Sequence, residues 1–425
     1  MSNLSDVMSN KVCLPEKIPV DWIWVELTQV CRPKQWKTIS SSEMTMSGYP
    51  VFGANGYVGF YTEYNHVDET IAITCRGNTC GTINRIPAKT YITGNSMALD
   101  DVEDKIITQD YLYHSLTHRS VSDAISGSAQ PQITGNSLKQ VRFPLAPLLE
   151  QQKIAAILTS VDDVIEKTQA QIDKLKDLKS GMMQELLTKG VGIKQGDSAN
   201  GKSYIPHSEF KDSPVGRIPK SWEVVKLGDT GKWRGGGTPS KTNKEFWSGS
   251  IPWVSPKDMK LDLISRTQDH VSAKAIKESS TNLIPKGSLL MVVRSGILQH
   301  TLPVAIAGCD LTVNQDIKAL TVSERYDTRF IFHYLKAHNH KVLRATLKAG
   351  NTVESIDFNE FSKFVIPSPP FEEQVKIADL VDSVANKISS KVSKLNQTSN
   401  LKKALMQDLL TGKVRVKVDN HLVVV

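Results

Sequence analysis

The sequence lacks the features that would place it among membrane, secreted or metal-binding proteins. No apolar run approaches the roughly 18 residues that a membrane-spanning helix needs, and the first residues, MSNLSDVMSNKV, lack the apolar stretch of a signal peptide. The five cysteines are odd in number and form no C-x-x-C pair, which argues against a disulfide framework and a zinc site. We therefore expect a reduced, cytoplasmic protein without a metal or cofactor.

Motifs for catalysis are also missing. The sequence contains no N-P-P-Y or D-P-P-F motif for amino methylation and no G-x-G-x-x-G loop. Residues 235–242, GGGTPSKT, approach the phosphate-binding pattern G-x-x-x-x-G-K-[ST], but Ser240 replaces the second glycine and Pro239 interrupts the loop. Residues 338–340 read HNH, although nuclease sites of that name draw their residues from a whole ββα unit. We predict that the chain is not an enzyme.

Charge is unevenly spread along the 425 residues, which carry a net charge of +8. Residues 218–369 contain 21 basic and 14 acidic residues, a net charge of +7, whereas residues 18–146 contain 10 basic and 12 acidic residues, a net charge of −2. A basic balance favours nucleic acid as a partner. In the acidic first segment, local basic patches would have to provide that attraction.

The chain contains an internal repeat. Residues 148–190 align without a gap with residues 371–413, at an offset of 223 and with 15 identities in 43 positions. Upstream the offset between matching residues is smaller. Leu116 matches Leu335 at an offset of 219, and Trp22 matches Trp222 at an offset of 200. Each half is therefore a variable block followed by a fixed block. We expect the two tryptophans to pack inside their blocks.

The fixed blocks have the heptad periodicity of a coiled coil. The predicted seam positions of the first copy are Ile154, Leu158, Val161, Ile165, Thr168, Ile172, Leu175, Lys179, Met182 and Leu186. Those of the second copy are Ile377, Val381, Val384, Ile388, Lys391, Leu395, Thr398, Lys402, Leu405 and Leu409. The polar members weaken the seam and could fix its register or meet another partner. A helix of some 40 residues is about 60 Å long and is not stable alone, so we expect the two copies to pair.

The variable blocks have a mixed pattern. Residues 70–74 and 288–293 are short apolar stretches typical of strands, and residues 111–117 and 330–337 have a helical pattern. The predicted fold is α+β, with two mixed α/β domains in tandem, separated by two long helices that pair as an antiparallel coiled coil about a pseudo-twofold axis. The predicted parts are a leader (1–17), a first domain (18–146), a helix (147–190), a linker (191–217), a second domain (218–369), a second helix (370–413) and a tail (414–425).

This plan suits a ligand with two separated parts. An antiparallel helix pair would relate the two halves by a pseudo-twofold axis and hold the two domains apart. Duplex DNA has a local twofold axis as well, so two such domains could read half-sites that lie one or more helical turns apart. The helices would then set the spacing between the half-sites.

Several stretches resemble the specificity subunits of type I restriction–modification enzymes, in order along the chain from about Ile18 to Val416. The stretches that resemble target-recognition domains are GGTPSKTNKEFWSGSIPWVSPKDM (236–259), YPVFGANGYVGF (49–60) and CRGNTCGTI (75–83). The stretches that resemble the central junction and the second helix are FKDSPVGRIPKSWEVVKLGD (210–229), PPFEEQVKIADLVD (369–382) and MQDLLTGKVRV (406–416).

This resemblance implies a non-catalytic subunit in which each target-recognition domain reads one half of an asymmetric, bipartite sequence in double-stranded DNA. The helices would set the spacer and dock two methyltransferase subunits, which modify adenine with S-adenosylmethionine. Two ATP-dependent translocase–nuclease (restriction) subunits would complete the enzyme, and no membrane is involved.

Arg76 and Arg294 are the main candidates for DNA contact, because they fall at matching places in the two halves, just after a predicted strand. An arginine there can reach a phosphate or a guanine, and the alternative is a structural arginine paired with an acid. The further predicted contacts are Asn55, Asn78, Lys241, Lys244, Ser255 and Lys257. For Asn55 a tight turn, and for the lysines a solvated surface, would be the alternative explanation.

Two other functions stay open at this point. The chain could be a protein-interaction adaptor whose coiled coil only organises partners, in which case DNA binding would be weak and indifferent to sequence. It could also serve a related bipartite-site system that cuts on both sides of its target. A single-chain nuclease–methylase would need catalytic motifs that the sequence lacks.

Overall fold

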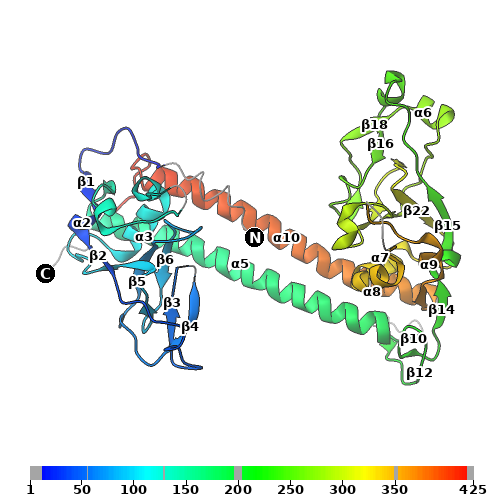
Figure 1. The fold of residues 1–425 in the computed structure, drawn as a ribbon, viewed down its shortest axis with the longest axis horizontal. Coiled ribbons are helices and arrows are strands. Elements are labelled where there is room, and N and C mark those ends of the chain that lie inside the picture. Colours follow the sequence, from blue (N-terminus) through cyan, green and yellow to red (C-terminus); the bar gives the residue numbers. More distant parts are fainter. Residues whose placement is uncertain (1–11, 55, 128–129, 196–202, 349–352, 419–425) are drawn as a thin grey trace. The chain divides into compact units, whose positions relative to one another are not determined.

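The computed structural model describes residues 12–54, 56–127, 130–195, 203–348 and 353–418 (Figure 1). The chain forms two compact units, and both boundaries between them fall inside long helices. The first unit comprises Met1–Ala170 and Val392–Val425, and the second unit comprises Gln171–Lys391. Each unit thus combines one variable block with one half of each long helix.

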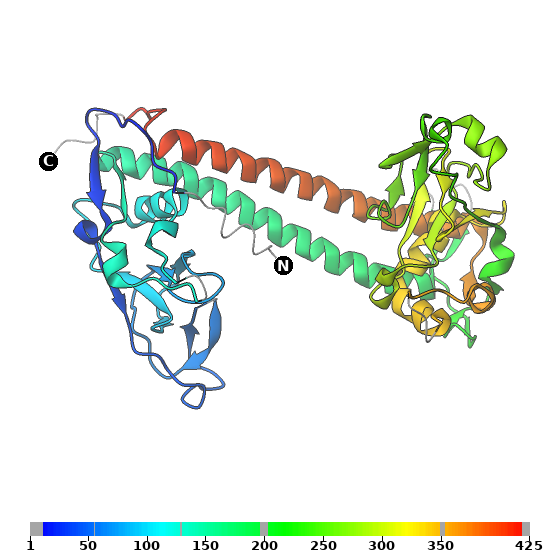
Figure 2. The ribbon, with the colours of Figure 1, turned by 45° about the horizontal axis from the view of Figure 1, so that its top comes forward.

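The two fixed blocks form the long helices α5 (Leu148–Lys189) and α10 (Phe371–Leu409). In the first unit, the first half of α5 lies beside the second half of α10, where Lys402 forms an ion pair with Asp162. In the second unit, the second half of α5 lies beside the first half of α10, where Nζ of Lys391 donates to Oε1 of Gln171 at 2.8 Å (Figure 2). The two helices therefore run antiparallel in both units.

The burial of the two helices follows the heptad pattern. Every predicted seam position of α5 and α10 is buried or half-buried, including the polar residues Lys179 and Lys402. Each helix begins directly after prolines and ends near a glycine in the left-handed region, Gly190 (φ +72°) or Gly412 (φ +70°). A Cβ at Gly190 would collide with Glu373, so this position needs glycine for space as well as for backbone conformation.

Two small sheets and a strand pair make up the variable part of the first unit. The larger sheet has the order β2 (Arg32–Gln35), β8 (Ser96–Asp100), β5 (Thr70–Thr74), β6 (Ile83–Ile86). The smaller sheet has the order β4 (Tyr57–Tyr61), β3 (Tyr49–Phe52), β7 (Tyr91–Ile92), and β1 (Ile23–Glu26) pairs with β9 (Arg142–Leu145). The helices are α2 (Leu27–Val30), α3 (Gln109–Arg119), η1 (Ser122–Ala124) and α4 (Gly135–Leu138). Strand β5 is buried along its whole length, so it forms the centre of this core.

The second unit repeats this arrangement with insertions. Its main sheet has the order β15 (Gly231–Gly235), β22 (Ile317–Val322), β19 (Leu289–Val292), β20 (Val304–Ala307), β17 (Leu263–Ile264). Its smaller sheet has the order β18 (Asp269–Val271), β16 (Ile251–Val254), β21 (Thr312–Val313), and β14 (Glu223–Lys226) pairs with β23 (Val365–Ser368). The linker forms two short pairs, β10 (Ile193–Gln195) with β11 (Ser203–Ile205) and β12 (Phe210–Lys211) with β13 (Ile218–Pro219). The helices are η2 (Leu227–Thr230), η3 (Lys244–Trp247), α6 (Ala273–Glu278), η4 (Gly296–Gln299), α7 (Thr328–Ala337), α8 (Asn339–Thr346) and α9 (Phe358–Lys363).

A tryptophan–glutamate contact fixes each variable block to the start of a long helix. The indole N–H of Trp22 donates to Glu150 of α5 at 3.0 Å, and that of Trp222 donates to Glu373 of α10 at 2.8 Å. All four residues are buried. Because a buried carboxylate needs partners to offset its lost hydration, these contacts specify where the helix meets the block. The expectation that both tryptophans pack inside their blocks agrees with their burial.

The next residue of each helix holds a second element of its block. The side chain of Gln151 accepts from the backbone N–H of Thr108, which caps α3. The side chain of Gln374 accepts in the same way from the N–H of Asp327, which caps α7. The repeat found in the sequence is thus a repeat of specific buried hydrogen bonds.

Candidate nucleic-acid interface

Three loops of the first unit meet at the end of strand β5. The N–H of Cys75, just after β5, donates to the carbonyl of Asn95 at 3.0 Å. The hydroxyl of Ser96 donates to the carbonyl of Gly53 at 2.8 Å, which brings the turn after β3 to the same end of the sheet. The predicted contact Asn55 lies outside the described residues.

Arg76 is exposed at this end of the sheet. Its backbone pairs with Gln132 in a single antiparallel bridge, and the N–H of Ile133 donates to the carbonyl of Cys75 at 3.0 Å. Among the described residues, no acidic side chain forms an ion pair with Arg76, so the structural alternative for this arginine finds no support. Its guanidinium is free to contact a ligand.

A pocket of about 460 Å³ lies beside Arg76. Its lining is polar and includes the side chains of Asn78, Gln130 and Gln132. These three residues are exposed, and their carboxamides make no hydrogen bond to another described residue. Gln130 and Gln132 were missed by the sequence reasoning, because they lie more than 50 residues after Arg76 and are brought there by a single backbone bridge.

Arg294 occupies the equivalent place in the second unit. It follows β19, it is exposed, and its backbone pairs with Ser355 in a single antiparallel bridge. The N–H of Ile356 donates to the carbonyl of Val293 at 2.8 Å, as Ile133 does to Cys75 in the first unit. Arg294 also forms no ion pair with a described acidic residue, so both predicted arginines present a free guanidinium on the same backbone frame.

The loop after β16 reaches the same end of the second unit. The N–H of Asn314 donates to the carbonyl of Val254, and the N–H of Val293 donates to the carbonyl of Asp316. The next residue, Ser255, directs its N–H and its hydroxyl to Asp258, at 2.9 and 2.8 Å. The hydroxyl of Ser255 therefore holds its own turn, and Lys257 is the exposed residue of that turn.

The two remaining predicted lysines lie in other parts of the second unit. Lys241 is exposed in the glycine-rich loop, whose Gly237 carbonyl accepts the indole N–H of Trp253 at 3.0 Å. Lys244 belongs to η3, which packs against β18 and α6 near the start of β16 rather than near its end. The structure therefore places Lys257 in a turn at the same end of the second unit as Arg294, whereas Lys244 lies near the start of β16.

The near-match to a phosphate-binding loop has a structural explanation. A Cβ at Gly236 would collide with the backbone of Val313, and one at Gly237 would collide with the backbone of Ser280. These glycines are therefore needed for close backbone packing. The loop opens no helix of the kind that holds phosphate, since only the short helix η3 follows it.

The residues of the HNH sequence join helices α7 and α8. The ring of His338 stacks on Tyr334 and donates to its carbonyl at 3.0 Å, and burial lowers the pKa of His338. The side chain of Asn339 exchanges two hydrogen bonds with the backbone of Leu302, each 2.8 Å long. Within the part of the chain that the structure describes, no group of three His, Cys, Asp or Glu residues could hold a metal ion.

Cys31, Cys75 and Cys80 of the first unit are buried, whereas Cys13 is half-buried. Burial raises the pKa of both Cys31 and Cys75 to about 12, so these thiols stay protonated and unreactive at neutral pH. Among the described residues, no helix is both long and apolar enough to cross a membrane.

Fold and site together define a duplicated recognition protein, in which two related modules each present an arginine-bearing loop cluster and share an antiparallel helix pair. A family model described as "Type I restriction modification DNA specificity domain" matches residues 19–177 and 219–398. The chain therefore belongs to the family of type I restriction–modification DNA specificity subunits, a non-catalytic class, as its sequence predicted.

Individual relatives agree with this assignment. The specificity subunit of the Escherichia coli type I restriction enzyme EcoR124I/EcoR124II is 42% identical over 174 residues, which cover 41% of each chain, so this match spans less than half of the relative's length. The putative specificity subunit MjaX of Methanocaldococcus jannaschii is 31% identical over 313 residues, 72% of this chain and 68% of the relative.

Solved structures confirm the predicted fold. The crystal structure of a type I restriction–modification S subunit from M. genitalium has a TM-score of 0.64 at 15% identity, over 95% of this chain and 99% of that chain. A chain from a structure that concerns complex assembly and conformational transition of the type I R-M system has a TM-score of 0.50 at 17% identity, over 94% of this chain and 100% of that chain.

Proposed function

We propose that this chain gives a type I restriction–modification complex its DNA sequence specificity. Each unit reads one half of an asymmetric, bipartite target in double-stranded DNA, and the helices α5 and α10 set the spacer between the halves. The observation that carries this proposal is the placement of Arg76 and Arg294, which are exposed, unpaired with any described acid, and held by equivalent backbone bridges.

The chemistry of these loops suits base recognition. Arginine can bind the O6 and N7 atoms of guanine in the major groove, and a carboxamide can bind the N6 and N7 atoms of adenine. Arg76 with Asn78, and Arg294 with its neighbours, supply such groups, while Lys241, Lys244 and Lys257 attract phosphates. Ser255 shapes the turn that presents Lys257, and Asn55 is a further proposed contact outside the described residues.

The partners follow from the proposed family role. We propose that two methyltransferase subunits dock on the helices and that two restriction subunits complete the complex, in the cytoplasm and without a membrane. The apolar seam residues of α5 and α10 would keep the two halves of the target at a fixed separation. The seam residues are Ile154, Val161, Ile165, Ile172, Leu186, Ile377, Val384, Ile388, Leu395 and Leu409.

The deciding experiment is the mapping of methylated adenines across the genome of a methylation-free host. The host would express the methyltransferase subunit with and without this chain. A bipartite motif that appears only with the chain supports the proposal, and replacing residues 218–369 by those of a relative should change one half of the motif only. A soluble complex without chain-dependent methylation would contradict the proposal.

A further inference from the structure

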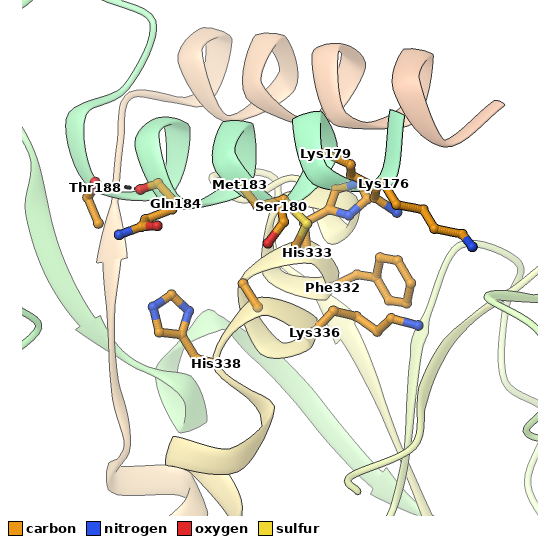
Figure 3. A pocket seen from close by; sticks show the side chains of 11 residues that line it. Lys176, Lys179, Ser180, Met183, Gln184, Thr188, Phe332, His333, Lys336 and His338 are labelled. Carbon is orange, nitrogen blue, oxygen red and sulfur yellow. Dashed lines mark hydrogen bonds between the residues drawn. The ribbon is translucent and has the colours of Figure 1, made fainter. Parts of the chain in front are cut away.

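The second unit contains a basic pocket that lies outside the recognition loops. It has a volume of about 560 Å³ and lies between the last third of α5 and helix α7 (Figure 3). Lys179, Ser180 and Gln184 line it from α5, and His333, Lys336 and His338 line it from α7 and its end. None of these residues belongs to the proposed DNA interface.

The charges around this pocket leave a positive group without a partner. Lys336 forms an ion pair with Asp262 at 2.7 Å, and His333 contacts Asp382 at 2.7 Å. Lys179 forms no ion pair with any described residue, although it is half-buried in the helix seam. A half-buried lysine without a counter-charge favours a negative ligand.

The repeat supplies a matched comparison for Lys179. At an offset of 223, its counterpart in the first unit is Lys402, which forms an ion pair with Asp162. At the same offset, the counterpart of Asp162 in the second unit is Ala385, which carries no charge. The first unit therefore neutralises this seam lysine internally, whereas no described acid of the second unit does so.

The equivalent groove of the first unit is covered by the chain itself. Gln407 and Arg119 are the repeat counterparts of Gln184 and His338. The N–H of Cys13 donates to the carbonyl of Arg119 at 3.0 Å, and its thiol donates to Oε1 of Gln407 at 3.4 Å. A segment without helix or strand thus crosses between α3 and α10 at this point.

The matching segment of the second unit takes a different path. Residues 210–219 fold back as the hairpin of β12 and β13, and the hydroxyl of Ser213 closes the turn on the carbonyl of Gly216 at 2.6 Å. By the offset of the two tryptophans, Ser213 is the counterpart of Cys13. Because Ser213 is held in this hairpin, it does not occupy the place in the groove that Cys13 occupies in the first unit.

We propose that the pocket between α5 and α7 is a docking site for an extended, acidic segment of a methyltransferase subunit. The partner rests on the proposed function, which assigns that subunit to the helices, and six residues of the pocket lie on α5. The segment that contains Cys13 in the first unit crosses the groove without helix or strand, which supports an extended ligand in the second unit. Lys179 supports an acidic ligand, because it has no described counter-charge. The incoming backbone donates to the exposed end of α7, and an acidic side chain pairs with Lys179.

The test measures the affinity of the purified methyltransferase subunit for the full chain. Lys179→Met removes the charge while keeping an unbranched side chain in the seam, and Ser180→Trp fills the pocket from an exposed helix position. Both variants should raise the dissociation constant about tenfold or more. Lys174→Met, on the same helix but exposed and outside the pocket, should change it less than about twofold.

The outcomes separate this inference from the proposed function. Unchanged methyltransferase affinity in both folded variants would overturn the docking site. Unchanged methyltransferase affinity with weaker DNA binding by the assembled complex would also overturn it, because the pocket would then bind a DNA phosphate. If the wild-type complex forms but no methylation depends on the chain, the proposed function is wrong. The affinities of the Lys179, Ser180 and Lys174 variants for the methyltransferase subunit still test the docking site in that case. Should Lys179→Met unfold, Ser180→Trp decides alone, because its position is outside the seam.

Discussion

The two units present an arginine on the same backbone frame but surround it with different side chains. In the first unit Arg76 lies among the carboxamides of Asn78, Gln130 and Gln132. In the second unit the position that matches Pro131 is Glu354, whose carboxylate accepts a hydrogen bond from Gln299. A carboxamide matches adenine, whereas a carboxylate accepts from the amino group of cytosine. Under the proposed function, this difference lets a duplicated frame address two different half-sites.

The largest expected difference between the units concerns the buried glutamates. Glu373 accepts from Trp222, from His207 and from two backbone N–H groups, so Glu373→Ala should destabilise the second unit by about 3–5 kcal/mol. Glu150→Ala should cost about 1–3 kcal/mol, because its partner Arg415 is partly exposed and keeps Asp21. Urea unfolding followed by tryptophan fluorescence measures both losses. Equal losses of unfolding free energy would show that the extra partners of Glu373 add no stability beyond that of the Glu150 contact.

The next difference concerns the paired histidines of α3 and α7. Burial, together with Arg85 and Lys402, lowers the pKa of His114 to about 3 from its ordinary 6.5. As the pH falls, the imidazole of His114 is therefore protonated in the unfolded chain before it is protonated in the folded chain. The free energy of unfolding of the first unit should then fall by about 1.4 kcal/mol per pH unit, from about pH 6.5 down to about pH 3. His114 lies 4.0 Å from Asp162, whereas His333 contacts Asp382 at 2.7 Å.

Replacing each histidine tests this difference. The difference between the unfolding free energies at pH 7 and pH 5 should shrink by about 2 kcal/mol in His114→Phe and by less in His333→Phe. An unchanged pH dependence in His114→Phe would mean that other groups cause it.

Removing either arginine should weaken recognition of one half-site only. Arg76→Ala and Arg294→Ala should each lower the affinity for the specific target by about 1–3 kcal/mol, roughly tenfold to a hundredfold, and relax a base in the corresponding half. Arg142→Ala, which removes an exposed arginine of β9, serves as the control. Equal losses on specific and random DNA would reassign the two arginines to phosphate contact.

The smallest expected effect is that of exchanging a single recognition side chain between the units. Gln132→Ser gives the first unit the residue that Ser355 provides in the second. It should relax one base position in the first half-site, with a severalfold change in the methylation ratio at that position and no change in the second half. A methylation map of the variant that matches the wild type at every position would exclude Gln132 from base recognition.

Elements defined by local periodicity were predictable from the sequence. The apolar stretch 70–74 is strand β5, residues 111–117 lie within α3, and residues 330–337 lie within α7. The heptad pattern correctly predicted which face of each long helix is buried, because apolar residues at this spacing lie on one face of a helix. The matching positions of Arg76 and Arg294 were also visible, since the repeat offset carries over into the backbone bridges.

Features set by distant contacts were not predictable. Gln132 reaches Arg76 through a single bridge between residues far apart in the sequence, which no local pattern reports. The hydroxyl of Ser255, a predicted DNA contact, is directed to Asp258 three residues later, a local contact that loop position alone did not indicate. Lys244 lies in a loop with lysines that looked equivalent, and only the packing of η3 against β18 and α6 separates it from Arg294.

The division into units also bears on the order in which the molecule forms during synthesis. The second unit is one continuous stretch, so all of its residues are synthesised before residue 392 is added. The core of the first unit includes Met406, Leu409 and Leu410 beside Ile71 and Tyr111, so residues made early must wait for residues made more than 290 positions later. Domains generally fold as their residues emerge. The unit encoded first is therefore completed last, because part of its core is synthesised only after the whole of the second unit.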